Sequence, residues 1–222
     1  MSAPTPRQLR SRQTMTETGA KKSDVALVCI DVQRDFVPPP TADGSEAEPV
    51  QRIRELVATA RENDVPVIFV RELHNPSLVD LGREVDGVEG LHCIEGTTGA
   101  DFVEGFGPRP DEYQIRKRRY SAFFGTDLDI VLRGYGVNTI VLTGGLTDVC
   151  VHYTAVDAHQ HDYHVRVVED AVFASSPPAH EAALAAMKYL QINAVLDSDD
   201  AGALIRARAT GTQPAIAAAT PV

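Results

Sequence analysis

The chain has 222 residues, 43% of them hydrophobic, with 21 Lys and Arg against 31 Asp and Glu, a formal net charge of −10. This length and composition suit one sizeable domain with a full core. An acidic surface repels phosphate backbones, so we expect no nucleic-acid partner. No apolar run approaches the ~20 residues of a membrane-spanning helix, so we expect no membrane segment.

The two ends of the chain differ in composition from the part between them. Residues 1–23 carry charges but lack the apolar stretch of a secretion signal, so we interpret them as a flexible arm. Residues 208–222 are small and include prolines, which favours a disordered tail. We therefore expect a single domain over 24–207.

Three cysteines form neither a disulfide framework nor a metal-binding pair of the C-x-x-C type. They are Cys29, Cys93 and Cys150. Free thiols fit a reducing compartment, so we expect a cytoplasmic protein.

Short runs rich in Val and Ile alternate with helical patterns along the chain. We predict strands at 24–31, 65–72, 113–117, 137–145, 164–171 and 192–197. We predict helices at 48–65, 126–136, 148–163 and 177–191, and a short one after 197. Strands that are apolar on both faces and alternate with helices indicate an α/β fold. We expect a three-layer α-β-α sandwich around a mainly parallel six-stranded sheet, with the irregular segment 72–112 as a lid or binding loop.

Three chemically active residues fall at one edge of this predicted sheet. Asp31 closes the first strand, Lys117 closes the third, and Cys150 begins the helix after the fourth. Ligands of open α/β sheets bind at this carboxyl edge. A helix N-terminus and an ammonium group stabilise a thiolate, and a carboxylate can accept the thiol proton and return it to a leaving amine. Together the three indicate nucleophilic catalysis, although each alone also fits packing, a turn or a solvated face.

The turn before Cys150 is suited to holding a substrate oxygen. Gly144 and Gly145 allow the backbone to approach a ligand closely, so Gly145 is a candidate substrate contact. Amide groups of this turn and of Cys150 are candidates for stabilising an oxyanion. Cys29, in the middle of a strand, and Cys93, in a Gly-rich loop, are better explained as packing residues.

Four blocks in order resemble the isochorismatase-like cysteine hydrolases, over roughly residues 24–200. They are ALVCIDVQRDFV, IRKRRYSAFFGTDLD, VLTGGLTDVCVHYTAVDA and VRVVEDAVFASSPPAHEAAL. The resemblance implies the fold of that family, a triad of Asp31, Lys117 and Cys150, and a covalent intermediate. It also implies a cis peptide at Gly145–Leu146, which would direct the Leu146 and Cys150 amides toward one oxyanion. Because members are commonly dimers or tetramers, it further implies a homo-oligomer.

The retained cysteine separates the activities known in this family. True isochorismatases work without it, so Cys150 favours a cysteine-dependent amidohydrolase that cleaves a C–N bond of a small amide, carbamoyl or lactam substrate. Two alternatives stay open: an isochorismatase-type vinyl-ether hydrolase, and a catalytically idle oligomeric binding protein on the same fold.

The chain differs from the nicotinamidase branch of the family in the residues that bind a metal there. Nicotinamidases bind a metal through an Asp-x-His pair and a second His shortly after. Glu72 and His74 match this pair loosely, and no second His follows before His92. We therefore interpret Glu72 and His74 as polar loop residues and expect neither a metal nor another cofactor.

Aromatic residues near the predicted edge are candidates for the walls of a small flat pocket. They are Phe36, Tyr120 and Phe123, and each fits a core position equally well. Arg34 or Arg119 is a candidate partner for an anionic substrate group.

Overall fold

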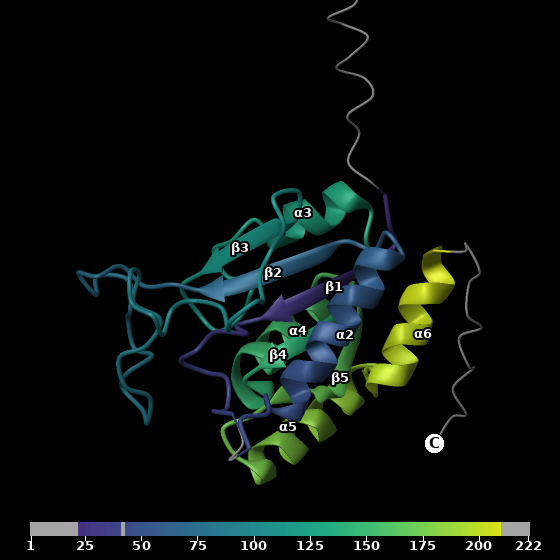
Figure 1. Cartoon of the computed structure of the whole chain (residues 1–222). Helices are drawn as coiled ribbons and strands as arrows, with labels where there is room; N and C mark the ends of the chain where they lie inside the picture. The colour runs from purple at the N-terminus through teal and green to yellow at the C-terminus, as the bar shows by residue number, and fades with distance from the viewer. Residues whose placement is uncertain (1–21, 41–42, 210–222) are drawn as a thin grey trace, which may run out of the picture.

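The computed structural model of the chain describes residues 22–40 and 43–209. Nearly all of the predicted arm and tail lie outside these residues. A six-stranded parallel sheet forms the centre, in the order β3-β2-β1-β4-β5-β6 (Figure 1). The strands are β1 (Val25–Ile30), β2 (Val67–Glu72), β3 (Tyr113–Lys117), β4 (Thr139–Gly145), β5 (His164–Phe173) and β6 (Val195–Leu196).

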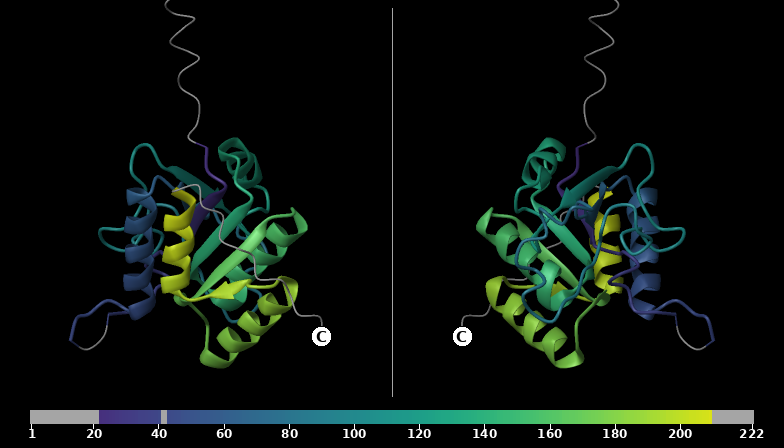
Figure 2. Two further views of the ribbon diagram at one scale, coloured as in Figure 1. Left: turned by 90° about the vertical axis from the view of Figure 1, so that its right-hand side faces the viewer. Right: turned by 90° about the vertical axis from the view of Figure 1, so that its left-hand side faces the viewer.

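Helices cover both faces of the sheet, which confirms the predicted three-layer sandwich (Figure 2). The helices are α2 (Glu48–Glu62), α3 (Leu128–Tyr135), α4 (His152–Gln160), α5 (Pro177–Leu190) and α6 (Ser198–Ala209), and a π-helix, η1 (Thr147–Val151), leads into α4. Helices α2 and α6 pack on one face, and α3, α4 and α5 on the other. None of the helices in the described part of the chain is both long and apolar enough to cross a bilayer.

The central strand β1 shows why the sheet has two covered faces. Every one of its residues is buried. Leu27 and Cys29 face the layer of α2 and α6, whereas Val28 and Ile30 face the layer of α3, α4 and α5. Successive side chains of a strand point to opposite faces, so an unbroken apolar run requires a helix layer on each side. The packing role predicted for Cys29 agrees with its place in this core, where it is 0% exposed.

Strand β5 is longer than the sequence predicted, and strand β6 is shorter. A register shift between Leu142 and Gly144 brings Gly144 opposite Val172, and this pairing extends β5 to Phe173. At the far edge, β6 is only two residues long. It starts late because Asn193 has a φ of 60°, in the left-handed region of a turn rather than in extended backbone.

The irregular segment after β2 is anchored at the carboxyl edge of the sheet. His74 bridges to Ile94, and Gln33, just after β1, bridges to Phe102. The Gln33 side-chain amide donates hydrogen bonds to the carbonyl oxygens of Glu72 and Ala100, both at 2.8 Å. This segment therefore contributes residues to the carboxyl edge of the sheet.

Candidate active site

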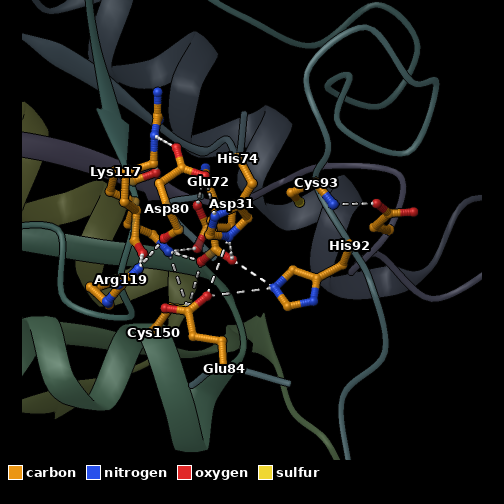
Figure 3. A network of polar contacts seen from close by, with 12 residues as sticks. Asp31, Glu72, His74, Asp80, Glu84, His92, Cys93, Lys117, Arg119 and Cys150 are labelled. Carbon is orange, nitrogen blue, oxygen red and sulfur yellow. Dashed lines mark hydrogen bonds and ion pairs between the residues drawn. The ribbon is translucent and has the colours of Figure 1, made fainter. Parts of the chain in front are cut away.

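Asp31, Lys117 and Cys150 meet at the carboxyl edge of the sheet (Figure 3). Asp31 directly follows β1, Lys117 ends β3, and Cys150 lies in η1. The Lys117 Nζ lies 2.7 Å from Asp31 Oδ2 and 3.4 Å from Cys150 Sγ. The three residues are 0%, 1% and 4% exposed. Because the strands are parallel, segments more than thirty residues apart deliver their ends to one point.

Glu72 is a fourth member of this group, and sequence reasoning missed it. It ends β2 and is 1% exposed, which differs from the polar loop position that we predicted. Its Oε2 forms an ion pair with Lys117 Nζ and lies 3.9 Å from Cys150 Sγ. Its position at the end of a strand was the available signal, the same one that identified Asp31 and Lys117.

Burial and neighbouring charges set the protonation states of the group. Burial raises the pKa of Asp31 to about 7, with Lys117 opposing this shift and Glu72 adding to it. Burial also raises the pKa of Cys150 well above its usual range; Lys117 lowers it, and the Asp31 and Glu72 carboxylates raise it further. Although burial alone would lower the pKa of Lys117, Asp31 and Cys150 hold it well above its usual value. The resting thiol is thus neutral, in contrast to the thiolate expected from the sequence, and it lies beside a carboxyl group that titrates near neutrality.

The turn between β4 and η1 depends on two glycines. A Cβ on Gly144, which has a φ of 102°, would lie 1.9 Å from the carbonyl oxygen of Ile30. A Cβ on Gly145 would lie 2.0 Å from the Phe173 ring. The peptide bond from Gly145 to Leu146 is cis. The absence of these two side chains lets the end of β4 pack directly against the end of β1, next to Asp31.

Cys150 is presented by a π-turn rather than by a regular α-helix. The Val151 amide donates to the Leu146 carbonyl oxygen at 3.1 Å, a bond that spans five residues. Such turns are rare and occur frequently at functional sites. The Val149 amide donates to the same oxygen at 3.1 Å, so the turn is closed on both sides of Cys150.

A second cluster of buried polar residues adjoins the thiol through Glu72. It comprises Glu72, His74, Glu84 and His92, which each offer a ligand atom within 4.8 Å of the others. Glu72 Oε1 lies 2.8 Å from His92 Nε2 and 3.2 Å from His74 Nε2. His74 Nε2 is also 3.3 Å from Glu84 Oε2. Within the described residues, both Glu84 oxygens are buried without a hydrogen-bond partner.

The donor set of this cluster fits a divalent metal ion. Two imidazole nitrogens and two carboxylates are ligands that Zn²⁺ and similar ions accept. A buried carboxylate with no hydrogen bond, as at Glu84, is costly unless a cation compensates it. Despite burial, the nearby Glu72 and Glu84 carboxylates raise the pKa of His74 to about 9, and the same two carboxylates raise that of His92 to about 10. Both rings are protonated at neutral pH without a metal, and a metal would displace their protons.

The candidate substrate contacts lie at different places in the structure. Tyr120 packs against the core cluster that includes Cys150, and burial first, then the charges of Glu89, Glu84 and Cys150, raise its pKa to about 12. Phe36 lies against the cluster, with its ring 5.4 Å from that of His92. Gly145 stays in the turn before Cys150.

Phe123 is placed elsewhere. Its ring stacks on His161, with centroids 5.2 Å apart. His161 caps the far end of α4, about 15 Å along the helix from Cys150. Phe123 therefore packs against the core rather than walling the site.

Glu84 and His92 could not be assigned from the sequence. They lie 12 and 20 residues beyond Glu72, in a segment without periodicity. Only the path of that segment in the folded chain brings Glu84 and His92 to the end of β2.

Comparisons with known proteins agree with the fold of this chain. The Isochorismatase domain model matches residues 25–200. A probable inactive nicotinamidase of Arabidopsis thaliana is 32% identical over 185 residues, 76% of this chain and 90% of the relative. The pyrazinamidase of Pyrococcus horikoshii, solved in complex with zinc, has a TM-score of 0.68 and 32% identity, with 78% of this chain and 99% of that one covered. The N-carbamoylsarcosine amidase of Thermoplasma acidophilum has a TM-score of 0.64 and 31% identity, with 79% and 97% covered.

Proposed function

Since the chain belongs to the isochorismatase family, we propose that it is a cysteine-dependent amidohydrolase that cleaves a C–N bond of a small amide, carbamoyl or lactam substrate. One observation carries the proposal. A single buried ammonium, Lys117 Nζ, lies 2.7 Å from a carboxylate oxygen of Asp31 and 3.4 Å from the sulfur of Cys150. Nucleophile, acid–base group and fixed positive charge are thus within reach of one substrate carbonyl.

In the proposed mechanism, Asp31 moves the proton. Its carboxylate accepts the thiol proton as the sulfur attacks the carbonyl carbon, and the carbonyl electron pair moves onto the oxygen. The Leu146 and Cys150 amides stabilise that oxyanion. Asp31 then gives the proton to the leaving nitrogen as the C–N bond breaks, which leaves a thioester. Water, deprotonated by Asp31, cleaves the thioester and restores the thiol. A pKa of about 7 suits a group that must both accept and return a proton near neutral pH.

Lys117 and Glu72 set the charge around this step. Lys117 keeps its proton and stabilises the negative charge that passes between sulfur and carboxylate. Glu72 touches the Lys117 ammonium with one oxygen and both imidazoles of the cluster with the other. We assign it a positioning role, because it holds Lys117 between Asp31 and Cys150.

The second cluster gives the proposed enzyme a place for a metal ion. Glu72, His74, Glu84 and His92 would hold a divalent cation, and this replaces our expectation that the protein needs none. A bound ion would supply a fixed positive charge that can orient an electron-rich group of the substrate. The residues of the chain still carry out each proton transfer and the attack.

The decisive experiment is ammonia release from a panel of small amides and ureas by the wild type and by Cys150→Ala. We expect turnover in the wild type, none in Cys150→Ala, and full turnover in the matched control Cys29→Ala. An active Cys150→Ala variant would exclude the nucleophile. Hydrolysis of a vinyl ether without ammonia release would favour the isochorismatase reaction instead, and no reaction with either class would favour an idle binding protein.

We also propose that the chain forms a homo-oligomer, a dimer or a tetramer, in the cytoplasm. Helices α3, α4 and α5, which cover one face of the sheet, each expose a large apolar side chain, and we propose this layer as the contact surface. These side chains include Ile130, Tyr153 and Tyr189. Light scattering that gives the mass of one 24.0 kDa chain would contradict the oligomer.

A further inference from the structure

Gln33 is a fully buried polar residue that the proposed mechanism does not use. It lies two residues after Asp31 and is 0% exposed. Its side-chain oxygen accepts the Glu72 amide N–H at 2.8 Å, and its side-chain nitrogen donates to the Glu72 and Ala100 carbonyl oxygens, each at 2.8 Å. The same nitrogen lies 3.3 Å from Cys93 Sγ. Both hydrogens and the oxygen of this amide are therefore in use.

These contacts replace the backbone pairing of β1 with β2 beyond the last residue of β1. The two strands are parallel, with Ile30 opposite Val70, and the Asp31 amide still donates to the Val70 carbonyl oxygen at 3.1 Å. Asp31 has a φ of 50°, which turns the chain out of the strand. A continued strand would offer Glu72 one backbone acceptor and one backbone donor at this point. The Gln33 side chain supplies both, so the chain turns at Asp31 without leaving these buried backbone groups of Glu72 unpaired.

Glu72 is the residue whose position this arrangement fixes. With its backbone held, its carboxylate reaches two groups at once (Figure 3). Its Oε2 forms an ion pair with Lys117 Nζ, and its Oε1 lies 2.8 Å from His92 Nε2 in the proposed metal cluster. A shift of the Glu72 backbone would move both oxygens together. It would therefore disturb the triad and the metal cluster at the same time.

The irregular segment after β2 does not depend on Gln33 alone for its attachment. Arg71 Nε also donates to the Ala100 carbonyl oxygen, at 2.7 Å, and Arg71 Nη2 donates to Asp101 Oδ1 at 3.1 Å. Removal of the Gln33 amide would therefore leave the segment tied to β2 through Arg71. The effect of the removal would be felt at Glu72, whose carbonyl oxygen would lose its side-chain donor.

We infer that Gln33 is a positioning residue, which extends the pairing of β1 past the turn at Asp31 and so holds the Glu72 carboxylate between Lys117 and the metal cluster. The inference rests on the proposed metal cluster and adds the residue that aligns this cluster with the triad. Residues that orient a metal ligand without touching the ion typically change metal affinity by about tenfold to a hundredfold when they are replaced.

Zinc affinity tests this role without knowledge of the substrate. Gln33→Met keeps most of the side-chain volume and removes the amide. Gln191→Met is the matched control, because the Gln191 amide accepts the Val165 N–H at 3.0 Å and donates to the Tyr163 carbonyl oxygen at 2.7 Å, at the opposite edge of the sheet. Each protein is titrated with Zn²⁺ by isothermal titration calorimetry. We would also record its urea midpoint and the visible spectrum of its Co²⁺ form, which follows the number and geometry of the ligands.

We expect Gln33→Met to weaken zinc binding by about tenfold or more and to change the Co²⁺ spectrum. Gln191→Met should lower the urea midpoint and leave zinc affinity and spectrum unchanged. Wild-type zinc affinity in Gln33→Met would overturn the inference. An equal weakening in both variants would also overturn it, because the loss would then follow stability, as would a wild type that binds no zinc.

A second variant covers the case in which Gln33→Met does not fold. Gln33→Asn keeps the amide but is one methylene too short to make both contacts with Glu72, so it should weaken zinc binding in the same way. Wild-type affinity in Gln33→Asn would overturn the inference. Failure of both variants to fold would make Gln33 a residue of the core alone and would also overturn its positioning role.

Ammonia release separates this inference from the proposed function. On an amide that the wild type hydrolyses, we expect zinc-saturated Gln33→Met to lower kcat by about tenfold with a smaller change in KM, because Lys117 is no longer held between Asp31 and Cys150. Ammonia from no amide of the panel, with zinc binding weakened only in Gln33→Met, would count against the amidohydrolase and support the positioning role. Wild-type kcat in zinc-saturated Gln33→Met would support the amidohydrolase and overturn the link from Gln33 to Lys117.

Discussion

Replacing Lys117 by Met removes the positive charge at the centre of the site and keeps most of the side-chain volume. The Lys117 Nζ lies 3.4 Å from the Cys150 sulfur. At an effective dielectric constant near 20, unit charges at that distance interact by about 5 kcal/mol, an upper bound of roughly 3.5 pKa units. One of the two carboxylates that lose their partner, Asp31 or Glu72, will take up a proton and offset part of this effect. We therefore expect the pKa of Cys150 to rise by about one to three units.

The assay is the rate of alkylation of Cys150 by iodoacetamide between pH 6 and 10. Below its pKa, a thiol reacts in proportion to its thiolate fraction, so at a fixed pH the variant should react about tenfold to a thousandfold more slowly. Cys29 serves as the internal reference, because burial raises its pKa to about 12 and the charges that act on it are those of Arg61 and Glu112. An alkylation curve that superimposes on the wild-type curve would refute the electrostatic role of Lys117.

Stability provides the control for the same variant. Two buried carboxylates without their ammonium should cost about 3–5 kcal/mol at pH 7, measured by urea unfolding. In the variant the pKa of Asp31, which burial already raises, rises further above that of the unfolded chain. The loss of stability should therefore be small below about pH 4 and should grow as the pH rises through the raised pKa of Asp31. Lys117→Arg, which keeps the charge, should not show this pH dependence.

Three other predictions test the turn, the surface and the metal cluster. Gly145→Ala should lower the free energy of unfolding by about 2–4 kcal/mol, because its Cβ would overlap the Phe173 ring; an unchanged urea midpoint would show that the ring can move. Glu112→Gln should cost about 1 kcal/mol at pH 7, allowing for solvent screening, because the two Arg61 hydrogen bonds lower the pKa of Glu112 although burial opposes them. That contribution is present above the unfolded pKa and disappears as the pH falls through the lowered value, so equal losses at pH 3 and pH 7 would contradict it. Glu84→Gln should weaken zinc binding tenfold or more in isothermal titration calorimetry, and unchanged affinity would remove this residue from the donor set.

The sequence by itself determined the layer architecture and the three residues of the proposed triad. Its signals were local: apolar runs buried on both faces, helical periods between them, and polar residues at the ends of runs. In a parallel sheet, all such ends lie at one edge, so Asp31, Lys117 and the start of the helix with Cys150 could be assigned to one place without any distance. The same rule applies to Glu72, which ends β2, although its loose match to a metal-binding motif led us to interpret it as a polar loop residue.

Tertiary structure alone decided which other groups reach that edge and with what charge. Glu84 and His92 belong to an irregular segment whose path depends on contacts such as those of Gln33, which no periodicity encodes. The protonation of Cys150 also depended on packing, since burial and two carboxylates outweigh one ammonium. Chain periodicity acts over a few residues, whereas desolvation and Coulomb forces act through space, and only the folded chain specifies those distances.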